Sequence, residues 1–205
     1  MEFRGKDDID SALSLLAATM EARGLAPCEL VVIGGAAFNL ADIVIRPTTD
    51  VDVLALCEGR STDSAPILVK HKPLPGPITA AAASVAEALG LGPDWLNGGP
   101  ADLLDCGLPE GFESRLAFRR YGTHLAVLTP SREDLICLKV YAAADSGVGR
   151  HTQDIEALNA TCEELLAGAR WARSQDPSVE FRAELVGLLR YYGCKPAAEV
   201  LSNED

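Results

Sequence analysis

The sequence is short of cations and has no long apolar run. Lysine and arginine account for 18 of its 205 residues, aspartate and glutamate for 30, and the net charge is −12. Because binding to a phosphate backbone requires clustered cations, this balance argues against a general nucleic-acid-coating protein. No apolar run approaches the ~20 residues that a membrane helix needs, and the charged start, MEFRGKDDID, is unlike a signal peptide. We therefore expect a soluble, cytoplasmic protein that makes no membrane contact.

Closely spaced cysteine pairs are also missing. Six cysteines are scattered along the chain, and no two form a C-x-x-C pair. A structural zinc site is therefore not expected. Most of these cysteines lie in apolar stretches, which favours reduced thiols in the core of a cytosolic protein. They are Cys28, Cys57, Cys106, Cys137, Cys162 and Cys194.

The order of the secondary-structure patterns indicates the fold class, and there is no internal repeat or low-complexity tract. The expected elements up to residue 130 are a helix at 7–24, strands at 29–33, 49–57 and 67–70, a helix at 78–90, and strands at 114–120 and 123–129. The later ones are helices at 131–144, 152–158, 161–174 and 179–192. Strands come first and helices last, which predicts an α+β fold with a small mixed sheet, flanking helices and a helical C-terminal half. We expect an α/β core at residues 1–130 and a helical region at residues 131–205 packed on it, with one continuous domain as the alternative.

Two aspartates, Asp50 and Asp52, interrupt a stretch that otherwise has the pattern of a buried strand. Residues i and i+2 of a strand share a face, so these carboxylates should project side by side, about 6.6–6.8 Å apart along the chain. That spacing suits oxygen ligands for one or two divalent cations, with Mg²⁺ (or Mn²⁺) usual where carboxylates meet phosphate. Without a cation, the two charges would raise each other's pKa. The alternative is that both are solvated at an exposed strand start or paired with Arg46.

Gly34 and Gly35 end the preceding strand and lead into a short helical segment. Such a turn leaves backbone N–H groups free, and glycine lets a phosphate approach the backbone closely. A Gly-Gly pair by itself more often marks a plain turn. With a carboxylate pair on the next strand, however, it supplies the parts that position a triphosphate and its metal. Arg46 and Thr48 or Thr49 could add further hydrogen-bond donors.

Several blocks of the sequence resemble the nucleotidyltransferase superfamily, whose members transfer a nucleotidyl group from an NTP. The blocks are GGAA at 34–37, RPTTDVD at 46–52, DWLN at 94–97, LKVYAA at 138–143 and RHTQDIEAL at 150–158. The resemblance is closest to the small bacterial nucleotidyltransferases of the family designated DUF6036, relatives of the abortive-infection and toxin–antitoxin nucleotidyltransferases. It covers most of residues 29–175.

The resemblance implies roles for residues in the first half of the chain. Gly34 and Gly35 would hold the phosphates of an NTP. Asp50 and Asp52 would be catalytic and would bind Mg²⁺ or Mn²⁺. The physical interpretation of the same residues agrees with these roles.

The resemblance also implies that Lys139 and Asp154 complete the catalytic site from the helical half. A cation within the apolar segment ICLKVYAAA is costly unless it meets a carboxylate or a phosphate, and Asp154 is a suitable partner. The alternatives are that Lys139 extends along the surface to reach water, and that Asp154 only favours the first turn of its helix. Arg150, close to Asp154, is a candidate phosphate contact.

The sequence departs from the family pattern at one point. Many active nucleotidyltransferases add a third carboxylate from a neighbouring strand, and neither RLAFRRY nor THLAVLT offers one. Either Asp154 takes that role from a helix, or the site holds a single metal, or the protein no longer catalyses.

The function implied by the resemblance is transfer of a nucleotidyl group from an NTP to an acceptor hydroxyl on RNA or a protein. The alternatives are a catalytically degenerate, antitoxin-like or nucleotide-sensing protein, and an interaction module that uses the acidic C-terminal helices. A partner protein or a homo-oligomer fits each of these. If RNA is the acceptor, cations should gather at the rim of the site. The candidates are Lys70, Lys72, Arg115, Arg119, Arg120 and Arg150.

Overall fold

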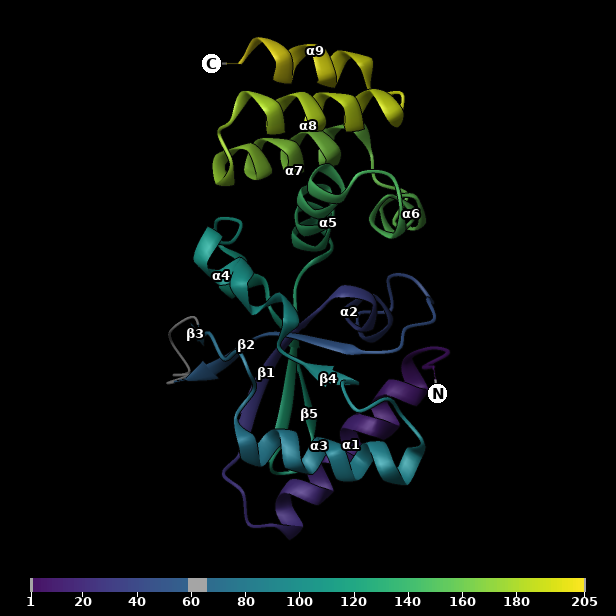
Figure 1. Ribbon diagram of the computed structural model, residues 1–205, viewed down its shortest axis with the longest axis vertical. Coiled ribbons are helices and arrows are strands. Elements are labelled where there is room, and N and C mark those ends of the chain that lie inside the picture. The colour runs from purple at the N-terminus through teal and green to yellow at the C-terminus, as the bar shows by residue number, and fades with distance from the viewer. Residues whose placement is uncertain (1, 59–65, 205) are drawn as a thin grey trace. The chain divides into compact units, whose positions relative to one another are not determined.

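The computed structural model describes residues 2–58 and 66–204 (Figure 1). The chain divides into two compact units, Met1–Ser131 and Arg132–Asp205. Among the described residues, every strand belongs to the first unit, and the second unit is helical. The prediction of an α+β fold is confirmed.

The strands of the described residues form one mixed, six-stranded sheet. Its order is β3-β2-β1-β6-β5, with β4 paired to β2. Strand β1 is parallel to β6 and antiparallel to β2, and β4 is parallel to β2. The strands are β1 (Cys28–Ile33), β2 (Val51–Glu58), β3 (Ile67–Val69), β4 (Leu96–Asn97), β5 (Ala117–Tyr121) and β6 (Leu125–Thr129). Sequence patterns miss β4, because a strand of two residues is too short to show a periodicity.

Helices of the first unit cover the sheet and bury its central strands. Helix α1 (Lys6–Ala22) packs beside α3 (Gly76–Leu89) and also contacts β5 and β6 (Figure 1). Four of its apolar side chains recur at helical spacing and are completely buried. They are Ile9, Leu13, Leu16 and Met20. Residues 30–33 of β1 are buried without alternation, as expected for a strand covered on both faces.

Trp95 anchors the segment that leads into β4. Its side chain is buried, and its indole Nε1–H donates a hydrogen bond to the carbonyl of Ala82 in α3 at 2.9 Å. The ring of Phe3 packs edge-on against it, with centroids 6.1 Å apart. The Trp95 carbonyl accepts a hydrogen bond from the Val51 N–H at 2.5 Å. These contacts hold the start of β2, where Asp52 lies.

The second unit is a bundle of helices. They are α5 (Arg132–Ser146), α6 (Arg150–Ala157), α7 (Cys162–Gln175), α8 (Val179–Tyr191) and α9 (Lys195–Asn203). Helix α5 packs against α6, α7 and α8, and α7, α8 and α9 lie stacked on one another (Figure 1). The sequence patterns predict the first four of these helices and miss α9. None of the described helices is long and apolar enough to cross a membrane.

The expectation of reduced thiols is wrong for two of the six cysteines. Cys162 at the start of α7 and Cys194 just before α9 form a disulfide, with Cα atoms 5.4 Å apart. These residues are 32 positions apart in the sequence and meet because α7, α8 and α9 fold back on one another. Local sequence patterns do not indicate that two residues so far apart in the sequence lie close together in space. Cys106, a thiol, is exposed rather than buried.

Candidate functional site

The turn at the end of β1 is formed by Gly34 and Gly35, which begin the short helix α2 (Gly34–Leu40). Gly34 has a φ of 71°, in the left-handed region that favours glycine. A Cβ atom at Gly34 would lie 2.8 Å from Asp52 Oδ2, and one at Gly35 would lie 3.0 Å from Thr48 Oγ1. Close approach by these polar side chains therefore requires glycine at Gly34 and leaves little room for a side chain at Gly35.

Strand pairing places Asp52 beside this Gly34–Gly35 turn. The antiparallel β1–β2 ladder sets Ile33 opposite Asp52, after an extra residue in β2, Leu54, shifts the register. On the other side of β2, the parallel β4 sets Asn97 beside Asp52, and Asn97 Nδ2 donates a hydrogen bond to Asp52 Oδ1 at 3.2 Å. One carboxylate oxygen of Asp52 thus faces Asn97, and the other faces Gly34.

Asp50 lies just before β2 and next to the same turn. The Thr48 hydroxyl donates a hydrogen bond to Asp50 Oδ1 at 3.1 Å, and that hydroxyl oxygen is also the atom closest to Gly35. The Arg46 guanidinium borders Gly35 as well, since its Nη1 would lie 3.4 Å from a Cβ atom there. The Asp52 carboxylate, the Thr48 hydroxyl and the Arg46 guanidinium therefore line the turn, and Asp50 is hydrogen-bonded to that hydroxyl. Thr49, the remaining candidate in this segment, is exposed.

Asn39 holds the loop that carries Arg46. Its buried Nδ2 donates hydrogen bonds to the carbonyls of Gly35 at 2.9 Å and Arg46 at 2.7 Å. Its Oδ1 accepts a hydrogen bond from the Arg46 N–H at 3.1 Å. Sequence reasoning missed this residue, although a single amide inside the apolar run AAFNLA was a usable signal.

The chemistry of these residues fits a divalent cation bound with phosphate. Carboxylate and hydroxyl oxygens are the ligands that Mg²⁺ and Mn²⁺ prefer, and the bare Gly34–Gly35 backbone gives phosphate oxygens access. Within residues 2–58 and 66–204, no group of three or more His, Cys, Asp or Glu side chains is arranged to hold a metal ion. Strands β5 and β6, which could have supplied a third carboxylate, contain no aspartate or glutamate.

In the second unit, Lys139 on α5 and Asp154 on α6 form a buried ion pair. Lys139 Nζ lies 2.6 Å from Asp154 Oδ2, and the two side chains are 8% and 1% exposed. The alternative in which Lys139 extends to the surface does not hold, because its side chain is enclosed. Burying two charges is costly, so each depends on the other for compensation. Arg150, the first residue of α6, is exposed.

The structure thus gathers the candidate residues into two groups, one in each unit. The first group surrounds the Gly34–Gly35 turn, and the second is the Lys139–Asp154 pair. That the two groups converge on one NTP stays a prediction.

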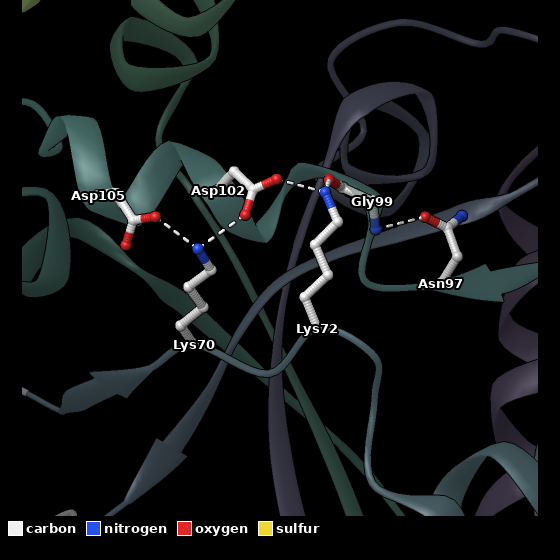
Figure 2. Close-up of polar contacts among 6 residues, drawn as sticks. All are labelled: Lys70, Lys72, Asn97, Gly99, Asp102 and Asp105. Carbon is white, nitrogen blue, oxygen red and sulfur yellow. Dashed lines mark hydrogen bonds and ion pairs between the residues drawn. The ribbon is translucent and has the colours of Figure 1, made fainter.

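The basic cluster at residues 70–72 is neutralised by carboxylates of η1 (Gly99–Asp102) and α4 (Leu103–Cys106), as Figure 2 shows. Lys70 Nζ lies 2.7 Å from Asp102 and 2.5 Å from Asp105, and Lys72 also pairs with Asp102. Hydrogen bonds from Lys70 and Lys72 lower the pKa of Asp102 to about 2. Arg119 is likewise paired, with Asp10 at 2.9 Å. Three of the six cations expected to meet RNA are therefore engaged within the protein.

Comparison with known proteins identifies the family. No curated protein and no solved structure matches the chain. A family model matches residues 8–161, which include both the Gly34–Gly35 turn with its carboxylates and the Lys139–Asp154 pair. That family, DUF6036, is described as a nucleotidyltransferase of unknown function, and the chain belongs to it.

Proposed function

We propose that the protein is a metal-dependent nucleotidyltransferase that moves a nucleotidyl group from an NTP to an acceptor hydroxyl on a protein or RNA. The observation that carries this proposal is the approach of Asp52 to the Gly34–Gly35 turn in a chain of this family, with Asp50 bonded to Thr48 at the same turn. Carboxylates beside an unobstructed backbone turn supply two things that an NTP needs, a place for its metal and a place for its phosphates.

Each residue at the turn has a task in this proposal. Asp50 and Asp52 would hold Mg²⁺ or Mn²⁺, which when bound neutralises the charge of the leaving pyrophosphate and activates the attacking hydroxyl. The Gly34–Gly35 turn lets phosphate oxygens lie against the backbone. Arg46, which borders Gly35, donates hydrogen bonds to those oxygens, and the Thr48 hydroxyl orients Asp50.

The residues of the second unit complete the proposed site. Lys139 stabilises the charge that develops on the phosphates, and Asp154 keeps that lysine charged and oriented. The exposed side chains of Arg150 and Thr49 are available to reach the phosphates or the acceptor. This part of the proposal requires the two units to meet at the same NTP.

The paired cations bear on the choice of acceptor. An RNA backbone would have to displace carboxylates from Lys70, Lys72 and Arg119 before these cations could bind it. This favours a hydroxyl on a protein over one on RNA.

A second candidate function is that of a catalytically degenerate, antitoxin-like nucleotide-binding protein. It is favoured by the missing third metal-binding side chain among the described residues. Such a protein would bind an NTP without transferring its nucleotidyl group. A role in a toxin–antitoxin or phage-defence system is compatible with both candidates.

The proposal is tested by incubating the protein with each α-labelled NTP and Mg²⁺ or Mn²⁺, with cellular RNA, with cellular protein, and alone. Label on protein or RNA supports transfer and identifies the acceptor. NTP binding without label transfer under every condition would favour the degenerate protein.

Asp52→Asn is the decisive variant for the metal-binding role. It keeps the shape of the side chain and an oxygen that can accept from Asn97, but removes one charge. We expect it to reduce transfer by at least about 100-fold and to weaken metal-dependent NTP binding without unfolding the protein. A matched control is Asp42→Asn, at an exposed aspartate that pairs with Lys6 in the same unit. A lower melting temperature with unchanged NTP binding in Asp52→Asn would refute the assignment.

A further inference from the structure

The segment Asn97-Gly98-Gly99 has no task in the function proposed above, although it lies beside Asp52. We propose that Asn97 is a positioning residue, which holds the Asp52 carboxylate in the orientation that binds the metal. This inference rests on the proposed function, and it adds a residue that acts on the metal through Asp52.

The hydrogen bonds of Asn97 define which way its amide points. The Gly99 N–H donates a hydrogen bond to Asn97 Oδ1 at 2.8 Å (Figure 2). Because a backbone N–H can only donate, the amide oxygen must face Gly99 and the amide nitrogen must face away from it. Nδ2 then donates to Asp52 Oδ1 at 3.2 Å and approaches the carbonyl of Asp94 at 3.4 Å.

The two glycines allow the chain to fold tightly around this amide. A Cβ atom at Gly99 would lie 2.8 Å from Asn97 Oδ1. One at Gly98 would lie 2.7 Å from the backbone carbonyl oxygen of His71. A side chain at either position would therefore displace the amide or the segment that supports it.

Lys72 supports the segment from the other side. Its Nζ donates a hydrogen bond to the Gly99 carbonyl at 3.1 Å and pairs with Asp102, as Figure 2 shows. A continuous set of contacts therefore runs from Lys72 through Gly99 and Asn97 to the Asp52 carboxylate.

The two carboxylate oxygens of Asp52 therefore have different neighbours. Oδ1 accepts the hydrogen bond from Asn97, while Oδ2 faces the Gly34–Gly35 turn. A neutral amide donor orients the carboxylate without adding a negative charge beside Asp50 and Asp52. Residues that orient metal ligands in this way change metal affinity by about 10–100-fold when they are removed.

The test is a Mn²⁺ titration of the full-length protein, followed by electron paramagnetic resonance, with and without a non-hydrolysable NTP analogue. We expect Asn97→Ala to weaken Mn²⁺ binding by about 10–100-fold. Gly99→Ala keeps the amide but pushes its oxygen aside, so it should weaken Mn²⁺ binding in the same direction. Asp105→Asn is the control, because it removes a nearby carboxylate that pairs with Lys70 and leaves the contacts of Lys72, Gly99 and Asn97 in place.

Asn97→Asp distinguishes positioning from direct ligation. A positioning residue loses its donor in this variant and Mn²⁺ binding weakens, whereas a direct ligand would gain a charge and bind Mn²⁺ more tightly. Tighter binding overturns the inference. So does wild-type affinity in folded Asn97→Ala, or an equal loss in Asp105→Asn. If Asn97→Ala does not fold, the Mn²⁺ affinity of Gly99→Ala is the deciding measurement: wild-type affinity in that variant would overturn the inference. If the wild-type protein binds no Mn²⁺ even with the NTP analogue, the proposed function and the inference fall together.

Discussion

At the scale of single residues, Gly34 and Gly24 have similar φ angles and different surroundings. Their φ angles are 71° and 62°, both in the left-handed region. A Cβ atom at Gly24 would meet no atom within 4 Å, whereas one at Gly34 would lie 2.8 Å from Asp52 Oδ2. The two positions therefore separate the cost of the backbone conformation from crowding of the candidate site.

We expect Gly24→Ala and Gly34→Ala each to lower the free energy of unfolding by about 1–2 kcal/mol, because alanine is strained at these φ angles. Gly34→Ala should also displace the Asp52 carboxylate and weaken NTP binding in the presence of Mn²⁺. Thermal melts and calorimetric titration of both variants measure the two effects. Equal NTP affinities for the two variants would contradict the placement of the phosphates at Gly34.

The Cys28 thiol gives a prediction about pH. Burial, and to a lesser extent the charge of Glu29, raises the pKa of this thiol from 9.0 to about 11. Above pH 9.0 the unfolded chain therefore loses the proton first, and stability falls as the pH rises towards about 11. Urea titrations across this range should show a smaller loss in Cys28→Ala than in the wild type. The exposed Cys106 provides the control, since Cys106→Ala should retain the wild-type slope.

At the scale of elements, the disulfide between Cys162 and Cys194 joins the start of α7 to the start of α9. It closes a loop that contains all of α8, so it restricts the unfolded chain. Breaking it should cost about 2–4 kcal/mol of the free energy of unfolding. We expect dithiothreitol to lower the melting temperature of the wild type but not that of the Cys162→Ala/Cys194→Ala variant. A wild-type melting temperature that does not respond to the reductant would show that the disulfide contributes no stability.

At the scale of the whole molecule, the proposed enzyme depends on residues from both units. The Gly34–Gly35 turn and its carboxylates belong to the first, and the Lys139–Asp154 pair belongs to the second. Whether that pair has a role beyond stabilising the second unit can be decided by removing one charge or both.

Lys139→Met leaves Asp154 buried without its partner and should cost about 3–5 kcal/mol of the free energy of unfolding. The double variant Lys139→Met/Asp154→Leu removes both charges and should recover most of that loss. If Lys139 contacts an NTP, the double variant should still fail to bind one with wild-type affinity, as a calorimetric titration would reveal. Full recovery of both stability and NTP binding would restrict the pair to a structural role.

Much of this organisation could be predicted from the sequence because it depends on neighbours along the chain. Helical spacing identifies α1, short apolar runs identify β1 and β2, and their order indicates an α+β fold. The Gly34–Gly35 turn and the Asp50–Asp52 pair are visible for the same reason, since each consists of residues no more than two positions apart. The family blocks add the expectation of a nucleotidyltransferase, and the family match agrees with it.

Contacts between distant parts of the chain were decided only by the tertiary structure. Asn97 reaches Asp52 across 45 positions because a two-residue strand, β4, pairs with β2. Lys70 and Lys72 are neutralised by carboxylates 35 and 30 positions away, and Cys162 meets Cys194 across 32 positions. Periodicity records which face of an element is apolar, but it does not record which other element covers that face. Packing of whole elements determines those distances, and with them which oxygen of Asp52 faces the Gly34–Gly35 turn.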